Sequence, residues 1–227
     1  MVNDAKARTA MIDGQLRPAG VNDPALLGAF GVLPMEAFLP PGFGGMAYAD
    51  DSLSLGGGYA LPAPLVIARL IQAARPRPRD VAFVVGDVTG YAAGLLSGLV
   101  STVITVLPGD EAVPKSLADQ AGRESLWAQY DLCNIAPVGK VATDQAICRG
   151  PFDIILICGA VAAFPPDFIS RLSPGGRMTG VLRENPESPG VLSCLERDQD
   201  HFSTTGLFDA ATPYVPGFSP APVFAFG

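Results

Sequence analysis

The sequence predicts an α/β protein built on a doubly wound, mostly parallel sheet. Between residues 81 and 182, short apolar runs alternate with amphipathic segments, and a glycine-containing turn at residues 86–90 follows the first of these runs. Such alternation builds a parallel sheet whose two faces are covered by helices. Near the C-terminus, two apolar runs follow each other with no helix between them, which predicts an antiparallel pair at one edge of the sheet.

The first 60 residues predict broken helices and a loop. Asp23 is a favourable N-cap and Pro24 suits the first helical position, so a short helix should run to Leu33. Residues 34–58 are rich in glycine, proline and acidic residues, and a loop of this length in a compact domain indicates a lid or a binding segment. Residues 64–74 then predict an amphipathic helix.

The central part of the chain predicts the strands and helices of the sheet in order. We expect strands at residues 81–85, 102–106, 134–138, 153–158 and 177–182, with helices at residues 90–99, 115–130 and 166–172. The antiparallel edge pair is expected at residues 191–197 and 201–208. In a sheet of this kind a ligand binds beyond the carboxyl ends of the first strands, where the turn at residues 86–90 lies.

The composition fits one domain. Of 227 residues, 48% are hydrophobic and 16% are charged, which supplies enough apolar material for one substantial core. We expect a single domain over residues 1–227, with a helical and loop extension at residues 1–60 and the core and tail at residues 61–227. The formal net charge of -7 argues against nucleic acid as a partner, because phosphate binding draws its affinity from Lys and Arg.

Three features of the sequence argue against a metal site, a catalytic histidine and a membrane span. They are the spacing of the cysteines, the position of the single histidine and the hydropathy pattern. Cys133, Cys148, Cys158 and Cys194 lie too far apart for paired metal ligands, so we expect reduced thiols and no metal site. His201 stands in an alternating stretch and is interpreted as a strand residue, not a catalytic base. No signal peptide layout and no run of roughly 18 uncharged apolar residues is present. We expect a location in the cytoplasm or at the cytoplasmic face of a membrane complex.

Motifs from three separate parts of the chain occur in the same order in one enzyme family. The first, helical part supplies Gln15, Leu16, Gly20, Asp23, Leu26, Pro34, Phe38 and Pro40. The second, glycine-rich part supplies Ala47, Tyr48, Asp50, Leu53, Leu55, Gly56 and Gly58. The third part supplies Pro151, Phe152, Asp153, Ile155, Leu172, Pro174, Gly175, Gly176 and Arg177. By these motifs the chain resembles the protein-L-isoaspartate O-methyltransferase family over nearly its whole length.

The resemblance implies both a fold and an activity. The family has a Rossmann-like S-adenosylmethionine methyltransferase fold with extra N-terminal helices and a variable C-terminal end. Its members use S-adenosylmethionine to esterify the carboxylate of L-isoaspartyl residues in damaged proteins. The same resemblance also shows where this sequence departs from the family, and those departures fall on positions to which the family gives chemical roles.

The acceptor segment is the first departure. The family has "G-Q-T-I-S-Q-P" there, and its serine and threonine hydroxyls lie beside the substrate carboxylate. In this chain residues 58–64 read G-Y-A-L-P-A-P, so that Tyr59 is polar, Ala60 replaces the threonine and Pro62 replaces the serine. Proline offers neither a hydroxyl nor a backbone N–H to orient a carboxylate. We therefore expect no catalytic residue and a degenerate acceptor segment at Tyr59, Ala60 and Pro62.

The glycine turn is the second departure. The family's "E-I-G-T-G-S-G-Y" becomes V-V-G-D-V-T-G-Y at residues 84–91, which retains Gly86 and Gly90 but places Val88 at the middle glycine. A branched side chain there should strain the backbone or fill the space of the ligand. Asp87 should bring a carboxylate close to the methionine carboxylate of the cofactor and repel it.

The adenosine end of the cofactor site is the third departure. An acid after the second strand normally accepts hydrogen bonds from both ribose hydroxyls, and the aligned residue here is Leu107, with Asp110 three residues too late. Lys140 stands where the family has an aspartate that faces the adenine amino group. We therefore expect S-adenosylmethionine binding to be lost, leaving a vestigial site at Gly86, Asp87, Val88, Gly90, Leu107 and Lys140.

These departures favour a pseudoenzyme with no cofactor. In this interpretation the chain is a non-catalytic accessory subunit of a larger assembly, such as a respiratory or other membrane-associated complex, with protein partners of unknown identity. One alternative is an active S-adenosylmethionine-dependent protein-L-isoaspartate O-methyltransferase in protein repair. Another is a pocket reassigned to a different small molecule.

Several residues also have purely structural interpretations. Gly86, Gly90 and Tyr91 are explained equally by a tight strand-to-helix turn. Asp50 and Asp51 form either a solvated acidic turn or a substrate-facing pair. Trp127 is expected to be partly buried on its helix, unless it marks an interface. The aromatic tail from Phe208 through Pro213, Tyr214, Val215 and Phe218 to Phe224 and Phe226 either packs back on the domain or docks onto a partner.

Overall fold

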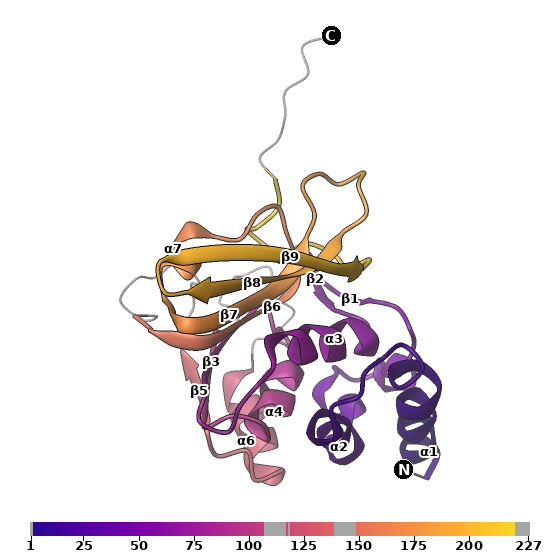
Figure 1. Cartoon of the computed structure of the whole chain (residues 1–227). Helices are drawn as coiled ribbons and strands as arrows, with labels where there is room; N and C mark the ends of the chain where they lie inside the picture. The colour runs from indigo at the N-terminus through magenta and orange to yellow at the C-terminus, as the bar shows by residue number, and fades with distance from the viewer. Residues whose placement is uncertain (1, 107–116, 118, 139–148, 221–227) are drawn as a thin grey trace.

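A seven-stranded mixed sheet forms the centre of the molecule in the computed structural model, which describes residues 2–106, 117, 119–138 and 149–220. The strand order is β5-β4-β3-β6-β7-β8-β9 (Figure 1). The parallel strands are β3 (Val81–Val85), β4 (Thr102–Val106), β5 (Ile135–Val138), β6 (Phe152–Val161) and β7 (Leu172–Leu182). The antiparallel edge consists of β8 (Val191–Asp198) and β9 (His201–Asp209). The predicted fold class is confirmed.

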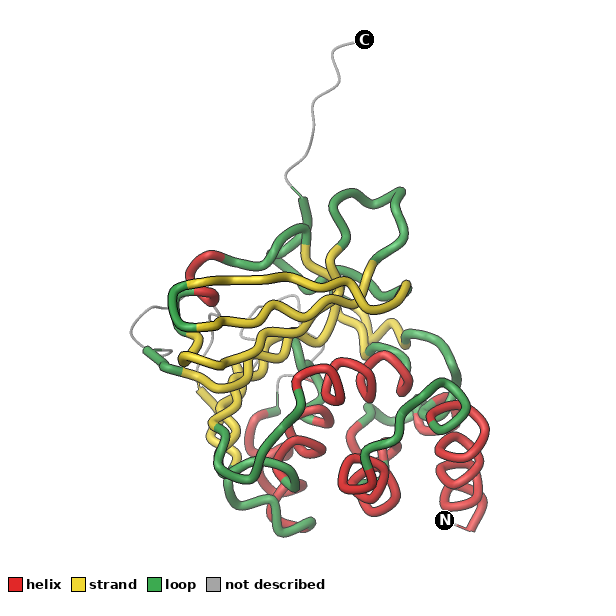
Figure 2. Tube along the Cα trace, viewed as in Figure 1, coloured by secondary structure: helices red, strands yellow, loops and turns green. Residues whose placement is uncertain are grey.

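The helices lie mainly on one face of the sheet, as Figure 2 shows. They are α1 (Val2–Met11), α2 (Pro24–Val32), α3 (Pro64–Ala74), α4 (Tyr91–Ser97) and α6 (Gln120–Gln129), while α7 (Pro166–Ile169) covers the other face. The carboxylate of Asp23 caps α2 by accepting from the backbone N–H groups of Ala25 at 2.9 Å and Leu26 at 3.3 Å. None of the helices in the described ranges is long and apolar enough to cross a membrane.

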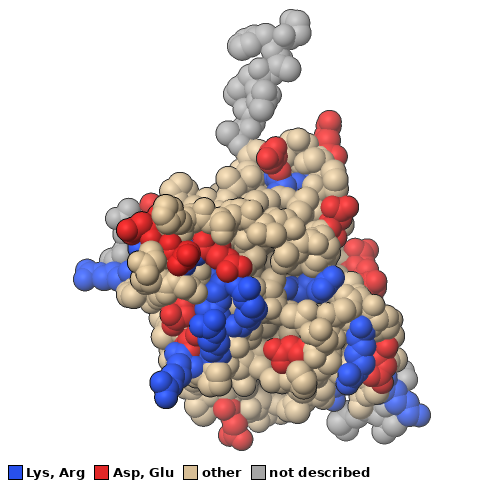
Figure 3. Space-filling model, viewed as in Figure 1, with Lys and Arg blue, Asp and Glu red and all other residues tan. Residues whose placement is uncertain are grey.

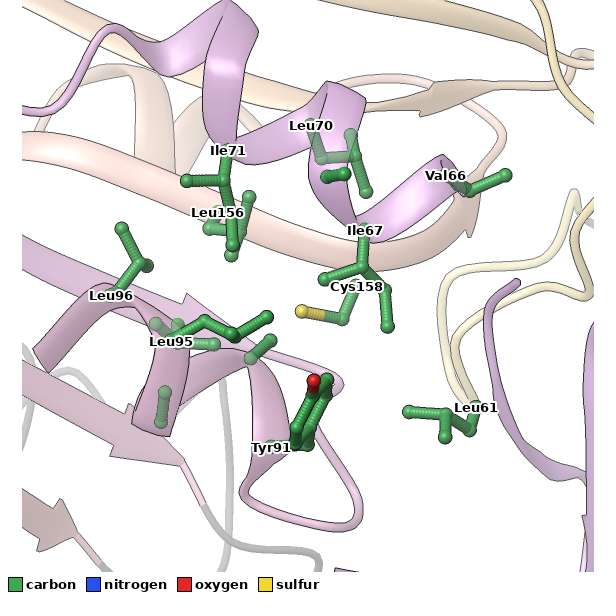
Figure 4. Close-up of a cluster of buried hydrophobic side chains, with 14 of the residues drawn as sticks. Leu61, Val66, Ile67, Leu70, Ile71, Tyr91, Leu95, Leu96, Leu156 and Cys158 are labelled. Carbon is green, nitrogen blue, oxygen red and sulfur yellow. The ribbon is translucent and has the colours of Figure 1, made fainter. Parts of the chain in front are cut away.

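The two faces of the sheet bury two separate apolar clusters, because successive strand residues point to opposite faces. Ala82 and Val84 of β3 belong to the larger cluster under α3 and α4, whereas Phe83 and Val85 belong to the smaller cluster under α7. Figure 4 shows the centre of the larger cluster, where α3, α4 and β6 meet. Its labelled members are Leu61, Val66, Ile67, Leu70, Ile71, Tyr91, Leu95, Leu96, Leu156 and Cys158.

The prediction of an unbroken loop at residues 34–58 is wrong in part. This segment contains two short 3-10 helices (Met35–Phe38 and Gly44–Met46) and the strand β1 (Leu53–Gly56), which pairs antiparallel with β2 (Tyr59–Leu61). β1 carries no apolar run and only Leu55 is buried in it, so hydrophobic periodicity could not reveal the strand. The predicted helix at residues 166–172 ends at Ile169, since Leu172 already begins β7.

The edge strand β9 is exposed along almost its whole length. Only Phe208 is partly buried, and the large side chains of Phe202 and Leu207 are each about half exposed. One side of β9 pairs with β8, and its other side has no neighbouring strand in the described part of the sheet. His201 begins this strand, as the sequence predicted.

Arg177 ties the amino ends of the sheet to the end of α3. It lies in β7 with 3% of its surface exposed and forms a salt bridge of 2.8 Å with Asp80, the residue before β3. Its Nε donates to the carbonyl oxygen of Ala74 at 2.8 Å, and its Nη2 donates to that of Arg75 at 2.6 Å. Arg75 has a left-handed backbone with φ +48°, so Arg177 also stabilises the turn that ends α3.

We predict that Arg177→Met lowers the free energy of unfolding by about 3–5 kcal/mol, because it leaves the Asp80 carboxylate buried without its partner. Urea denaturation followed by circular dichroism measures the change. The control is Arg17→Met, which breaks the exposed salt bridge with Asp13 and should cost less than about 1 kcal/mol. Equal losses in the two variants would contradict the role given to Arg177.

Candidate functional site

The turn between β3 and α4 lies at the carboxyl edge of the sheet, where the sequence placed the ligand. Gly86 and Gly90 both have left-handed backbones, with φ +78° and φ +80°. A Cβ atom at Gly86 would lie 2.8 Å from Cγ2 of Val215, and one at Gly90 would lie 2.8 Å from Cζ2 of Trp127. Both positions therefore require glycine for backbone conformation and for space.

Asp87 directs its carboxylate into the turn and the start of α4. It accepts from the backbone N–H groups of Gly90 at 3.0 Å and Ala93 at 2.8 Å, and the Thr89 hydroxyl donates to it at 3.3 Å. Burial raises the pKa of this carboxyl group, while the two backbone hydrogen bonds oppose the rise. Its oxygens therefore point into the turn and α4, and the expectation that Asp87 repels a cofactor carboxylate stays a prediction.

Val88 sits in the turn without a left-handed backbone. Within the described ranges, the residues other than glycine that have positive φ are Arg75, Asp131 and Gln199. The expected backbone strain at Val88 is therefore absent. Its side chain is buried in the larger apolar cluster.

Two side chains from α6 hold the carbonyl groups of this turn. Nη1 of Arg123 donates to the carbonyl oxygen of Val88 at 2.7 Å, and Nε1 of Trp127 donates to that of Gly90 at 3.0 Å. The two residues are four positions apart, so they lie on the same face of the helix. Trp127 is 2% exposed, which settles its role as packing against the turn and not as an interface residue.

Arg123 carries buried hydrogen-bond donors that have no partner among the described residues. It is 7% exposed, and its Nε and Nη2 are buried with no hydrogen-bond partner. Burial lowers the pKa of its guanidinium, and the charges of Asp87 and Asp119 oppose this fall. No sequence motif singles out Arg123, although the helix predicted at residues 115–130 places it on the same face as Trp127. Because Nη1 binds the Val88 carbonyl, the opposite edge of the planar guanidinium, which carries Nε and Nη2, points away from the turn.

The acceptor segment begins in the hairpin of β1 and β2. Tyr59 and Ala60 belong to β2, and Pro62 follows it, buried, just before α3. β2 also contacts β6, whose carboxyl end lies beside the turn at residues 86–90. The hairpin therefore places the predicted acceptor residues at the same edge of the sheet as the glycines.

A groove of about 850 Å³ lies next to this edge. Its lining comes from the loop before β1, the β7–β8 connection and the segment after β9, and includes Asp51, Ser52, Arg183, Gly190, Thr212 and Tyr214. The guanidinium carbon of Arg183 lies 5.3 Å from the centre of the Tyr214 ring, and the Tyr214 hydroxyl donates to the Arg183 carbonyl oxygen at 2.8 Å. Asp51 is exposed at the groove, whereas Asp50 does not line it.

The segment after β9 connects this groove to the glycine turn. The N–H of Ala160 in β6 donates to the Pro213 carbonyl oxygen at 2.9 Å, and the N–H of Val215 donates to the Ala160 carbonyl oxygen at 2.9 Å. Val215 then packs over Gly86. The tail therefore packs back on the domain as far as Phe218, which contacts Phe168.

Other predicted residues cannot be placed. Leu107, Asp110 and Lys140 of the predicted adenosine end lie outside the described residues, and so do Cys148, Phe224 and Phe226. Cys133, Cys158 and Cys194 are free thiols. On the face that Figure 3 shows, basic side chains lie next to acidic ones and form no continuous basic surface.

Asp87→Asn should lower the free energy of unfolding by about 1–3 kcal/mol, because the two N–H groups bind different carboxylate oxygens and the asparagine amide replaces one of these acceptors with an NH2 donor. Urea denaturation at neutral pH measures the loss. Asp50→Asn, which changes an exposed carboxylate in the same way, is the control and should alter stability by less than about 0.5 kcal/mol. A neutral effect of Asp87→Asn would show that the carboxylate does not cap the turn.

The mixed sheet, the antiparallel C-terminal strands and the N-terminal helices are those of the Rossmann-like methyltransferase fold. Residues 6–217 match the protein-L-isoaspartate(D-aspartate) O-methyltransferase (PCMT) family. The chain therefore belongs to this family, as its motifs indicated.

Relatives support this membership over nearly the whole chain. The protein-L-isoaspartate O-methyltransferase of Koribacter versatilis is 31% identical over an alignment of 220 residues that covers 94% of this chain and 94% of its own. That of Protochlamydia amoebophila is 27% identical and covers 87% of this chain and 90% of its own.

Solved structures resemble the fold. A protein-L-isoaspartate O-methyltransferase superimposes with a TM-score of 0.73 at 16% identity, covering 94% of this chain and 67% of its own. A second structure, from Plasmodium falciparum, is described as a putative enzyme of this kind in complex with S-adenosyl-L-homocysteine. It has a TM-score of 0.70 at 17% identity, and the match covers 91% of this chain and 96% of its own.

The prediction of an inactive accessory protein without a cofactor is wrong. The chain matches a methyltransferase family along residues 6–217, and relatives that carry the enzyme's name align with 94% and 87% of it. The physical error lay in treating the loss of individual motif side chains as the loss of the site. Val88 shows the error most directly, because the backbone strain expected there is absent.

Proposed function

We propose that this protein is an S-adenosylmethionine-dependent protein-L-isoaspartate O-methyltransferase. The observation that carries the proposal is the relative from Koribacter versatilis, which has the same extent as this chain and is 31% identical to it. The family match over residues 6–217 supports the same activity. Its substrates are polypeptides that contain isoaspartyl residues, and these are the protein partners that the proposal requires.

The proposed methyl transfer requires no general base from the protein. Bound S-adenosylmethionine supplies a methyl group on a positively charged sulfur. The free carboxyl group of an isoaspartyl residue is its α-carboxyl, whose ordinary pKa of about 3.5 leaves it ionised at neutral pH, so no general base has to activate it. The protein has to hold the carboxylate in line with the methyl group and exclude water from it. Ala60 and Pro62 therefore do not prevent the reaction by lacking hydroxyl groups.

The glycine turn is where the chain fits the cofactor. Gly86 and Gly90 keep the backbone in the conformation that brings the turn to the edge of the sheet. Arg123 and Trp127 bind the carbonyl groups of Val88 and Gly90 and so keep the turn in this conformation. Main-chain groups of the turn would thus hold the cofactor where the family uses side chains that this chain lacks.

The groove beside the turn suits the acceptor polypeptide. Its volume of about 850 Å³ is enough for several residues of an extended chain, and it opens next to the hairpin that carries Tyr59. Val215 follows Tyr214 of the groove and packs over Gly86, so an acceptor in the groove lies close to the cofactor turn.

The cytoplasmic location expected from the sequence remains a prediction, which the free thiols of Cys133, Cys158 and Cys194 support.

Methyl transfer to a synthetic peptide tests the proposal. With radiolabelled S-adenosylmethionine, a peptide that contains one L-isoaspartyl residue should form a base-labile methyl ester. The same peptide with an ordinary aspartyl residue is the control and should gain little label. The proposal fails if neither methyl transfer to the isoaspartyl peptide nor binding of S-adenosylmethionine is detected with folded protein.

Asp51→Lys should change the KM for charged acceptor peptides. An exposed charge at the groove interacts weakly with substrate, by up to about 1 kcal/mol, so KM should rise about threefold to fivefold for isoaspartyl peptides flanked by lysine. For peptides flanked by glutamate KM should fall. The matched control is Asp50→Lys, the neighbouring exposed acid that does not line the groove. The same shift in both variants would argue against acceptor binding in this groove.

A further inference from the structure

The edge strand β9 offers backbone groups for pairing along the nine residues His201–Asp209. β8 occupies one side of the strand, and the other side has no neighbouring strand within the described part of the sheet. Every residue from His201 to Leu207 is exposed, and Figure 1 shows β9 as the outermost strand. Such an edge can bind an extended polypeptide through main-chain hydrogen bonds, which do not depend on the sequence of the bound chain.

The carboxyl end of β9 leads directly into the groove assigned to the acceptor polypeptide. Asp209 ends the strand, and the next residues, 210–214, line this groove. The Ser52 hydroxyl donates to the Ala211 carbonyl oxygen at 3.4 Å, which joins this segment to the loop before β1. In Figure 1 the arrowhead of β9 accordingly lies beside β1 and β2. A chain paired with β9 can therefore continue into the groove.

A second groove, of about 360 Å³, lies between β9 and the helix α3. Its lining includes Thr205 and Leu207 of β9 and Arg69 of α3, whose guanidinium carbon lies 4.6 Å from the centre of the Phe208 ring. Alternate side chains of a strand point to the same face of a sheet. Every second side chain of a strand added to β9 would therefore lie over this groove, as in other proteins that bind extended peptides at a sheet edge.

The charges around β9 fit a basic polypeptide better than a second copy of this chain. Asp198 and Asp200 stand before the strand, Asp209 ends it, and Asp51 lies at the groove. The protein also has a formal net charge of -7. Lysine or arginine in a bound chain is attracted by these acids, whereas a second copy brings the same acids with it.

We propose that acceptor polypeptides bind as an added strand on the free edge of β9, antiparallel to it. This assignment rests on the proposed function, since it requires that the protein methylates isoaspartyl residues in polypeptides. An antiparallel chain runs from Asp209 towards His201, and such pairing is slightly more stable per residue than parallel pairing. The isoaspartyl residue then lies N-terminal to the added strand, in the groove. Because the contacts are made by the main chain, many sequences can bind.

Methylation of peptides with different extensions tests the direction and the extent of this pairing. One peptide carries about 16 uncharged residues after the L-isoaspartyl residue, enough to cross the groove and pair with all of β9, and another carries them before it. The extension after the isoaspartyl residue should lower KM at least ~10-fold, as expected for several added main-chain hydrogen bonds, and leave kcat unchanged. The extension before it should lower KM less than ~3-fold.

N-methylation of alternate residues in the extension separates main-chain pairing from other contacts. Neighbouring N–H groups of a strand point to opposite sides, so one of the two alternating sets faces β9 and the other faces away. Methylation of the first set should abolish the gain in KM, and methylation of the second set should preserve it. Equal effects of the two sets would show that the extension does not pair as a strand and would overturn the assignment.

Phe202→Lys and Leu207→Lys place charged side chains on the exposed edge, where lysine opposes the addition of a strand. Each variant should reduce the gain from the extension at least ~3-fold. Val32→Lys is the matched control, because Val32 is also an exposed apolar residue but lies on α2. This variant should keep the wild-type gain, and a loss as large as that in Phe202→Lys would argue against pairing at β9.

The outcomes separate this proposal from the proposed function. If the extension after the isoaspartyl residue gives no gain, or the extension before it gives an equal one, the assignment is overturned although methyl transfer stands. If light scattering shows a dimer that Phe202→Lys dissociates, the edge binds a second copy and the assignment is also overturned. If no isoaspartyl peptide is methylated and the folded protein does not bind S-adenosylmethionine, the proposed function fails, and the assignment fails with it.

Discussion

The buried ion pair between Arg177 and Asp80 is the constraint on which the arrangement of the sheet depends. It joins β7 to the start of β3, and through the carbonyl groups of Ala74 and Arg75 it joins both strands to the end of α3. β3 and β7 flank β6 on its two sides, so one guanidinium fixes three neighbouring strands at their amino ends. The opposite, carboxyl ends of these strands are then free to carry loops with functional residues.

A second constraint operates at that carboxyl edge. In the turn after β3, the Asp87 carboxylate accepts hydrogen bonds from backbone N–H groups, and the side chains of Arg123 and Trp127 donate to backbone carbonyl groups. Backbone groups, rather than a set of motif side chains, therefore determine the shape of the turn. This explains how Val88 can replace a glycine there without a left-handed backbone. The chemistry proposed for the protein agrees with such a site, because an ionised carboxylate needs positioning more than activation.

The sequence predicted most elements of the fold because their ends are marked by residues with a clear physical effect. Pro64 begins α3, and the strand β3 has the predicted bounds because Asp80 precedes its apolar run and Gly86 follows it. The hairpin of β1 and β2 was missed, since its strands are short and only partly buried. Patterns that extend over several residues could be identified, whereas pairing between short irregular segments depends on tertiary contacts.

The candidate site was harder to predict than the fold. Gly86 and Gly90 were identified from their spacing, but the direction of the Asp87 side chain and the unused edge of Arg123 depend on how α6 packs on the turn. A sequence shows which charged residues are present and not which oxygens and nitrogens already have partners. Counting substituted motif residues therefore overestimated what the site had lost.

The exposed edge strand β9 has a consequence for how the protein behaves at high concentration. An open strand edge is a template for pairing with another chain, and Phe202 and Leu207 would make such pairing more favourable. Asp198 and Asp200 stand at one end of this edge and Asp209 at the other, so two copies that align their edges bring like charges together. Salt screens such repulsion over a Debye length of about 8 Å at physiological ionic strength. Because added salt weakens the repulsion between the acidic ends of β9, the colloidal stability of the protein should fall as ionic strength rises.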